Sequence, residues 1–204
     1  MEKEEKIKIG LFGGTFAPPN LGHVNAARLM LKYIPIERLI VMPAFLPPHK
    51  VKADGDTPAE RMKMCQAAFS VLDRVKVSDY EIKKGGLSYS VETLRYFTSL
   101  GYEVYMLCGT DMFLSLPIWF CADEIFKLAN IVCVPRDTVL TETLEKAKKN
   151  YTEKYSANVT IIPERSVEMS SSEIREKIQS GESLRGLISD EVAEIIKNDK
   201  LYTR

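Results

Sequence analysis

Short apolar runs alternate with amphipathic stretches along almost the whole chain. Runs of strand length occupy residues 6–12, 39–42, 75–77, 104–108, 131–134 and 159–162. Apolar residues at helical spacing predict helices over 21–34, 57–72, 90–101, 123–129 and 141–155, with two more beginning near 170 and 189. This alternation is typical of an α/β protein with a doubly wound, mostly parallel sheet and helices on both of its faces.

Local signals mark where several helices begin. Residues 57–60 (TPAE) have the form of a capping box with proline at the first helical position. Ser90 is expected to cap the helix that ends at Gly101, and the glycine pair at 85–86 indicates a turn. In such a sheet, ligands bind beyond the carboxyl ends of the strands, where the strand order reverses. The loop over 13–22 is therefore the first place to look for a site.

Composition narrows the class of protein. At 204 residues the chain can bury a full core, and we expect one domain over 1–204. Lys plus Arg equals Asp plus Glu at 28 each, which argues against a generally basic nucleic-acid-binding surface. The charged N-terminus lacks the apolar run of a secretory signal, and no apolar stretch is long enough to cross a membrane. We therefore expect a soluble, cytoplasmic protein.

The cysteines do not have the spacing of a metal site. None of the four forms a CxxC pair, and only two histidines could join them in binding zinc. Cys108 and Cys133 lie in apolar runs that are predicted to be buried strands. We therefore interpret the cysteines as reduced thiols of the protein core.

The first loop has features that suit a phosphate. Paired glycines at Gly13 and Gly14 let backbone amides approach an anion closely, and the next helix offers its positive N-terminal end. The loop matches neither GxxxxGK[ST] nor GxGxxG. His23 falls in the first turn of that helix, on the side that faces the loop. Its imidazole could there donate to a phosphate oxygen.

A second candidate element, SSSEIR, lies far along the chain at residues 170–175. Serine hydroxyls and free amides at a helix start, with Arg175 one turn inside, form a natural cradle for a polyphosphate. Taken alone, this stretch is also an ordinary capping box. Together with the first loop, it favours a polyphosphate site.

The two elements together resemble the nicotinate-nucleotide adenylyltransferases, from the nucleotidylyltransferase superfamily with HxGH and ISSTxIR signatures. Residues 13–16 and 22–23 match the first signature, and 169–175 match the second with Met for Ile and Ser for Thr. The likeness runs nearly end to end. Further family-like segments follow in the same order at 47–50 (PPHK), 88–94 (SYSVETL), 109–111 (GTD) with Trp119, and 198–202.

The resemblance implies a fold, a reaction and its partners. The fold would be a Rossmann-like nucleotidylyltransferase fold, with the C-terminal helices from about residue 169 closing the ATP site. The chain would transfer the adenylyl group of ATP to nicotinate mononucleotide, giving deamido-NAD and pyrophosphate. Mg²⁺ would be held mainly by the ATP phosphates, because the sequence shows no carboxylate cluster for a protein cage. A homo-oligomer is compatible with the sequence, which does not determine the oligomeric state.

Residues on the ATP side follow from the resemblance, position by position. His23 would donate to α-phosphate oxygens, and Asp111 would accept from the ribose of the adenosine. The second signature would hold the leaving pyrophosphate. The implied ATP-binding set is Gly13, Gly14, Thr15, Phe16, Gly22, His23, Gly109, Asp111, Ser171, Ser172 and Arg175. The implied catalytic set is His23, Asn20 and Arg175.

The acceptor side follows in the same way. Trp119 would stack on the pyridine ring, and Ser90 with the Phe120 backbone would face the nicotinate carboxylate. Taken alone, a sole tryptophan is more often a core residue, and the PPHK segment could be a solvated loop. The implied acceptor-binding set is His49, Lys50, Ser90, Trp119, Phe120 and Arg136.

Two positions depart from the family pattern. Ala17 stands where the family usually has Asp, and Asn20 replaces the first histidine of HxGH. Asparagine is neutral and shorter than imidazole, so the change at Asn20 implies slowed turnover with ligand binding retained. Two alternatives stay open. One is a nucleotidylyltransferase for another acceptor, such as pantetheine phosphate or a polyol phosphate, and the other is a nucleotide-binding protein of low activity.

Overall fold

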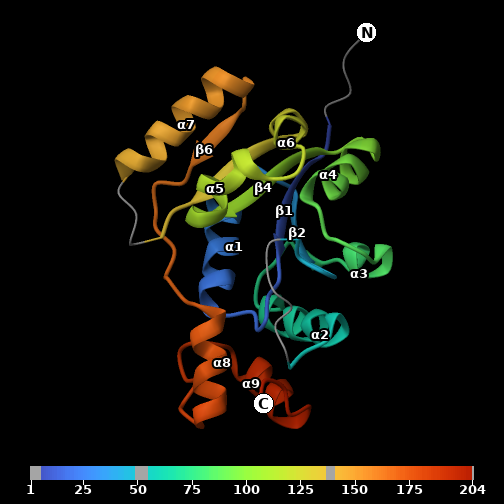
Figure 1. The fold of residues 1–204 in the computed structure, drawn as a ribbon, viewed down its shortest axis with the longest axis vertical. Helices are drawn as coiled ribbons and strands as arrows, with labels where there is room; N and C mark the ends of the chain where they lie inside the picture. The colour runs from blue at the N-terminus through green and yellow to red at the C-terminus, as the bar shows by residue number, and fades with distance from the viewer. Residues whose placement is uncertain (1–5, 49–54, 137–140, 204) are drawn as a thin grey trace.

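The computed structural model describes residues 6–48, 55–136 and 141–203. Within them one parallel sheet has the strand order β3-β2-β1-β4-β5-β6. Figure 1 labels β1, β2, β4 and β6 of this sheet. The strands are β1 (Lys8–Gly14), β2 (Arg38–Pro43), β3 (Val75–Val77), β4 (Glu103–Gly109), β5 (Ala129–Val134) and β6 (Val159–Ile161). All six strands expected from the apolar runs are present. The order reverses between β1 and β4, so the prediction of a doubly wound sheet is confirmed.

Helices connect the strands and cover the sheet. They are α1 (Leu21–Tyr33), α2 (Pro58–Phe69), α3 (Tyr80–Lys84), α4 (Ser90–Ser99), α5 (Thr110–Ser115), α6 (Ala122–Leu128), α7 (Thr141–Tyr155), α8 (Ser171–Ser180) and α9 (Asp190–Asn198), with a 3₁₀ turn at Leu116–Ile118. No helix within the described residues is long and apolar enough to cross a membrane.

The two faces of the sheet carry two separate apolar clusters. Phe12 and Leu39 point to the side covered by α1, α2, α8 and α9. Ile9 and Ile40 point to the side covered by α4, α6 and α7. Since neighbouring strand residues point to opposite faces, a sheet buried on both sides needs continuous apolar runs. This explains the apolar runs of the inner strands β1, β2, β4 and β5, whereas the edge strands β3 (VKV) and β6 (VTI) each have an exposed polar residue in the middle.

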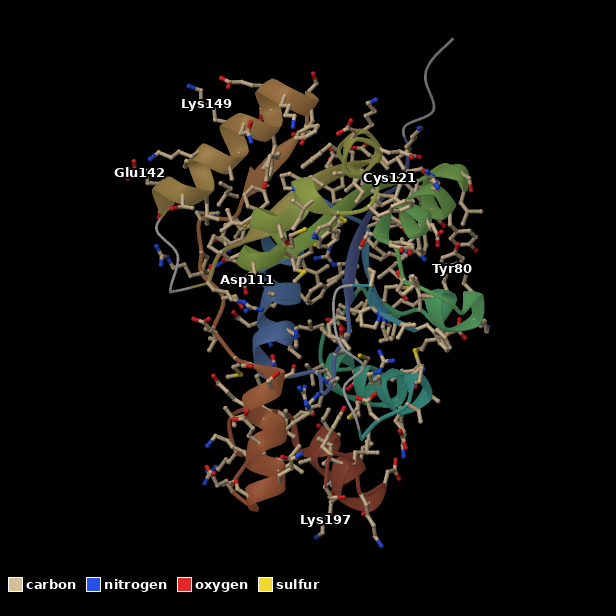
Figure 2. The ribbon with its side chains drawn as sticks, in the orientation of Figure 1. Tyr80, Asp111, Cys121, Glu142, Lys149 and Lys197 are labelled. Carbon is tan, nitrogen blue, oxygen red and sulfur yellow. The ribbon has the colours of Figure 1, made fainter. Side chains whose placement is uncertain are left out.

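Charged residues occupy the outer side of α7. Glu142 and Lys149 lie there in Figure 2, away from the sheet. On the inner side, Leu144 and Tyr151 are buried against the sheet and α6. The helix over 141–155 therefore agrees with its predicted bounds and with a largely solvated surface.

Several predicted boundaries were wrong by one to three residues. Ser90 does not cap α4: Tyr89 is the N-cap, in extended conformation, and Ser90 is the first helical residue. The same helix ends at Ser99 rather than at Gly101, and α2 ends at Phe69 rather than at residue 72. Helix ends depend on caps and local backbone angles that apolar spacing does not specify.

The short helices α3 and α5 were not predicted at all. They contain five and six residues, fewer than two turns each. Stretches of this length are too short to show an apolar period. Their absence from the prediction matters for the site, because α5 begins directly at the carboxyl end of β4.

Candidate active site

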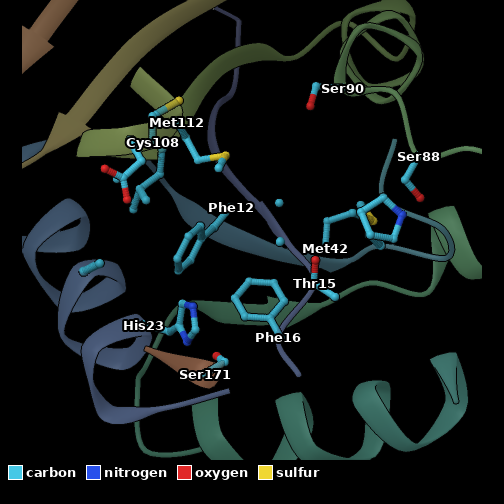
Figure 3. Close-up of a pocket in the computed structure, with 18 of the residues that line it drawn as sticks. Phe12, Thr15, Phe16, His23, Met42, Ser88, Ser90, Cys108, Met112 and Ser171 are labelled. Atoms are coloured by element: carbon cyan, nitrogen blue, oxygen red, sulfur yellow. The ribbon is translucent and has the colours of Figure 1, made fainter. Parts of the chain in front are cut away.

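A cavity of about 910 Å³ lies at the carboxyl ends of β1 and β4, where the strand order reverses. Figure 3 shows His23 and Ser171 at one end of it and Ser88 and Ser90 at the other. All the sequence-predicted site residues within the described part of the chain line this cavity. They are Gly13, Gly14, Thr15, Phe16, Asn20, Gly22, His23, Ser90, Gly109, Asp111, Trp119, Phe120, Arg136, Ser171, Ser172 and Arg175. His49 and Lys50 lie outside the described residues.

The glycine pair belongs to the end of a strand rather than to a loop. β1 runs through Gly14, with Gly13 opposite Met42 and Gly14 opposite Pro43 on β2. A Cβ added at Gly13 would meet no atom within 4 Å. The backbone is therefore open toward the cavity at this point, as a close approach by a ligand requires.

Asn20 and His23 form a reciprocal capping box at the start of α1. The Asn20 side-chain oxygen accepts from the His23 backbone N–H at 3.0 Å. His23 Nδ1 accepts from the Asn20 backbone N–H at 3.1 Å. Because Nδ1 is an acceptor here, the neutral imidazole carries its proton on Nε2. The cap thus sets both the orientation and the tautomer of the histidine.

Aromatic neighbours also position the imidazole. The ring centroid of His23 lies 5.1 Å from that of Phe16, nearly edge to face, and 6.2 Å from that of Phe12. Both phenylalanines are buried. Such packing leaves the ring few alternative rotamers.

The side-chain amide of Asn20 joins the two signature segments. It is 1% exposed and donates to the Met169 carbonyl at 3.3 Å and to Ser171 Oγ at 3.4 Å. Both amide donors are therefore engaged by the segment at the start of α8. In this arrangement the amide contacts protein acceptors, at a position that the resemblance places in the catalytic set.

The start of α8 is bound to the first loop by further hydrogen bonds. Ser171 Oγ donates to the Pro18 carbonyl at 2.8 Å, and Arg175 donates to the Ala17 carbonyl at 2.7 Å. A second guanidinium nitrogen of Arg175 donates to Ser172 Oγ at 3.1 Å. These bonds hold the helix N-terminus, with its positive dipole end, beside the loop that follows β1.

Arg136 lies beside residues implied for the other substrate. The resemblance implies Arg136 for the acceptor. In the structure its backbone N–H donates to Thr110 Oγ1 at 3.0 Å, and its guanidinium lies 3.4 Å from the Asp111 carboxylate. A Cβ added at Gly109 would stand 3.6 Å from the Arg136 guanidinium. The side chain of Asp111 is 72% exposed, so this ion pair contributes little stability. Arg136 therefore borders the residues that the resemblance implies for the ribose.

Aromatic side chains line the end of the cavity that lies away from His23 and Ser171 (Figure 3), which we call the acceptor end. Trp119 is partly buried, and its indole N–H donates to Ser115 Oγ at 3.1 Å. Phe120 is 52% exposed, with its ring 4.6 Å from that of Tyr89. Ser90, in the first turn of α4, lines the same end. A flat apolar group with a polar substituent would suit these surroundings.

Sequence reasoning missed a buried carboxylate at this end. Glu81, on α3, lines the cavity and is 5% exposed. Burial raises the pKa of its carboxyl, while hydrogen bonds from the Thr93 and Ser88 hydroxyls act in the opposite direction. Thr93 Oγ1 lies 2.6 Å from the carboxylate, and Ser88 Oγ accepts from the Phe45 N–H at 2.9 Å. No sequence signal marks Glu81, because α3 is too short to show its buried side.

No group of three or more His, Cys, Asp or Glu side chains gathers in a metal-binding arrangement among the described residues. The carboxylates near the cavity are separately engaged, Asp111 with Arg136 and Glu81 with two hydroxyls. A divalent cation bound here would therefore take most of its ligands from elsewhere, such as phosphate oxygens and water.

Known proteins resemble this chain in sequence and in architecture. Residues 11–177 match the cytidylyltransferase-like family. The chain belongs to this family. A Caldicellulosiruptor bescii protein named probable nicotinate-nucleotide adenylyltransferase is 33% identical over 198 residues, which cover 97% of this chain and 100% of that protein. A Clostridium perfringens protein of the same name is 34% identical over 199 residues, covering 97% and 98%.

Solved structures of proteins with low sequence identity to this chain have the same fold. The Plasmodium falciparum nicotinic acid mononucleotide adenylyltransferase complexed with NaAD matches with a TM-score of 0.76 at 17% identity, covering 97% of this chain and 98% of that one. The same enzyme complexed with APC matches with a TM-score of 0.73 at 16% identity, covering 96% of each chain. The expected resemblance to nicotinate-nucleotide adenylyltransferases and the Rossmann-like fold are thus confirmed.

Proposed function

We propose that this chain transfers the adenylyl group of ATP to nicotinate mononucleotide, forming deamido-NAD and releasing pyrophosphate. One observation carries the proposal. The loop after β1 and the start of α8 meet through the Asn20–Ser171 and Arg175–Ala17 contacts, and they line one cavity with Trp119. At about 910 Å³ the cavity lies near the upper end of the range of about 300–1,000 Å³ for ligand sites. It therefore suits two nucleotides better than one small ligand.

The chemistry requires alignment more than proton transfer. An oxygen of the nicotinate mononucleotide phosphate attacks the α-phosphorus of ATP, and the bond from that phosphorus to the bridging oxygen breaks as pyrophosphate leaves. A phosphate monoester has a second pKa of about 6, so the attacking group is already largely a dianion at neutral pH. No general base is needed. The protein must orient the two substrates and stabilise the charge on the transferring and leaving phosphates.

The end of the cavity at His23 and Ser171, which we call the phosphate end, has side chains suited to those tasks. His23 would donate from Nε2 to the α-phosphate, since Nδ1 is an acceptor in the capping box. Arg175, Ser172 and the amides at the start of α8 would hold the leaving pyrophosphate. Mg²⁺ bound mainly to the ATP phosphates would neutralise part of their charge. Since the reaction uses ATP, we expect the chain to act in the cytoplasm.

At the acceptor end, Trp119 would stack on the pyridine ring, with Ser90 and Phe120 near its carboxylate. A pantetheine phosphate or polyol phosphate offers no flat ring for this aromatic end, so these acceptors fit less well. Gly109 and Asp111 would bind the ribose of the adenosine, and Arg136 beside them would attract phosphate charge from either substrate.

The direct test combines ATP, Mg²⁺ and one acceptor at a time, with deamido-NAD or the corresponding product separated by chromatography and pyrophosphate measured in parallel. We expect product with nicotinate mononucleotide. The comparison set contains nicotinamide mononucleotide, pantetheine phosphate and glycerol phosphate. Faster turnover with pantetheine phosphate or glycerol phosphate would contradict the proposed acceptor.

A second candidate function is nucleotide binding with low activity. The engagement of both Asn20 amide donors favours it, because that side chain contacts Met169 and Ser171 where the family pattern has a histidine. Tight binding of ATP without release of pyrophosphate, with every acceptor in the comparison set, would favour this second function over adenylyl transfer.

A further inference from the structure

A buried arginine lies directly behind the wall of the cavity. Arg61, in the first turn of α2, is 5% exposed. Its guanidinium donates to the carbonyl oxygens of Thr15 and Phe45 at 3.1 Å each, and to that of Ala44. Thr15 and Ala44 line the cavity, and the Phe45 N–H binds Ser88, which lines it too. One guanidinium thus joins the chain after β1 to the chain after β2.

The remaining contact of Arg61 leads to the segment after α9. Arg61 Nε donates to Asp56 Oδ1 at 2.9 Å, and the Tyr202 hydroxyl donates to Asp56 Oδ2 at 2.6 Å. The Tyr202 N–H also donates to the Gly55 carbonyl at 3.2 Å. Tyr202 is 1% exposed. Burial and the neighbouring Asp56 raise the pKa of its phenol, so the hydroxyl keeps its proton and remains a donor at neutral pH.

These bonds are directed at the site rather than at general stability. A buried ion pair by itself is weak evidence for stability, since desolvation offsets the attraction between its charges. Here the guanidinium donates to three backbone carbonyls, and two of them belong to residues that line the cavity, Thr15 and Ala44. A second hollow of about 280 Å³ is lined in part by Thr15, Phe45, Asp56 and Arg61.

We propose that Tyr202, Asp56 and Arg61 form a positioning relay that sets the spacing between the phosphate end and the acceptor end of the cavity. Thr15 belongs to the ATP side, while Ala44 and Phe45 lead to Ser88 and the acceptor side. The segment after α9 therefore contributes to the rate of adenylyl transfer without touching either substrate. The inference rests on the proposed function, because two substrates must be aligned for spacing to matter.

Tyr202→Phe tests the relay, since it removes one hydroxyl and keeps the ring. We expect kcat at saturating substrates to fall about tenfold, because small displacements of reacting groups have large effects on rate. The Kd of a non-reactive ATP analogue and that of nicotinate mononucleotide, titrated separately, should each change less than about twofold, since neither subsite is altered itself.

Tyr105→Phe is the matched control. Tyr105 is partly buried and, like Tyr202, donates its hydroxyl to a carboxylate, that of Glu103, at 2.9 Å. It lies near the amino end of β4 and is not among the residues that line the cavity. Both variants lose one tyrosine–carboxylate bond, so we expect both to lose Tm, and Tyr202→Phe more because its bond is buried. Only Tyr202→Phe should lower kcat.

Asp56→Asn gives a second, shape-preserving test. If the three side chains act as one unit, the Asp56→Asn, Tyr202→Phe double variant should be no slower than the slower single variant. The relay is overturned if Tyr202→Phe loses Tm but keeps the kcat of the Tyr105→Phe control, or if the two rate effects simply multiply. A chain without substitutions that makes no product with any acceptor would overturn the proposed function, and the relay with it. If the chain without substitutions makes product and Tyr202→Phe has the same kcat, the relay alone is overturned.

Discussion

Asn20→Asp tests how the two phosphate-facing segments are held together. The carboxylate keeps the shape of the amide and can still accept from the His23 N–H, so α1 remains capped. It loses both amide donors, and an oxygen then faces the Met169 carbonyl and the Ser171 hydroxyl. The substitution therefore disrupts the link between the segments without removing the cap.

The structure allows the size of the effect to be worked out. Asn20 is 1% exposed, so water cannot replace the lost bonds. A buried acceptor left without a donor costs about 1–3 kcal/mol, and we expect the free energy of unfolding to fall by this amount. For an assumed separation of about 6 Å, a carboxylate repels one phosphate charge by about 3 kcal/mol at an effective dielectric constant of about 20. The Kd for ATP should therefore rise on the order of 100-fold.

Three measurements check this expectation. Urea unfolding gives the free energy of unfolding, calorimetric titration with a non-reactive ATP analogue gives Kd, and steady-state formation of deamido-NAD gives kcat. Ser189→Asp is the control, because it places the same residue at the N-cap of α9, outside the cavity lining. It should leave the Kd for ATP unchanged. If Asn20→Asp bound ATP as tightly as the chain with Asn20, the assignment of this junction to the phosphate end would be refuted.

Three further predictions follow from the site and the core. His23→Ala should lower kcat on the order of 10²–10³-fold and weaken ATP binding far less. Steady-state kinetics would give kcat, and titration would give the Kd for ATP. Near-normal turnover would remove His23 from the mechanism. Trp119→Ala should raise KM for nicotinate mononucleotide about tenfold with KM for ATP unchanged, whereas a loss of Tm alone would identify the indole as a core residue. In the folded chain, only the partly exposed Cys121 should react quickly with an aromatic disulfide reagent at pH 8. Burial raises the pKa of the Cys133 thiol to about 12 and also raises the pKa values of the Cys65 and Cys108 thiols. Rapid reaction of a second thiol would contradict this prediction.

The fold could be predicted from the sequence because its signals are local and repeated. A strand buried on both faces must be an apolar run, and the inner strands β1, β2, β4 and β5 each contain one. The long helices α1, α2 and α7 show apolar spacing over several turns. Helices of five or six residues cannot show such spacing, which is why α3 and α5 were missed.

The site was predicted as a set of segments rather than as an arrangement. Glycines at a strand end and hydroxyls at a helix start are visible in sequence, because each reflects local backbone geometry. The sequence alone also showed that Asn20 departs from the family pattern. It could not show that the amide of Asn20 is used by a serine 151 positions away.

Contacts between distant segments are decided by tertiary packing. Arg61 and Glu81 have no sequence signal, since charged residues on a helix are normally solvated. They are buried here because the ends of β1 and β2, the short helix α3 and the segment after α9 enclose them with carbonyls, hydroxyls and a carboxylate. The sequence by itself determined which residues could form a phosphate and acceptor site. The tertiary structure alone decided which of their donors are already engaged by the protein, because that depends on how separate strand ends and helix starts meet.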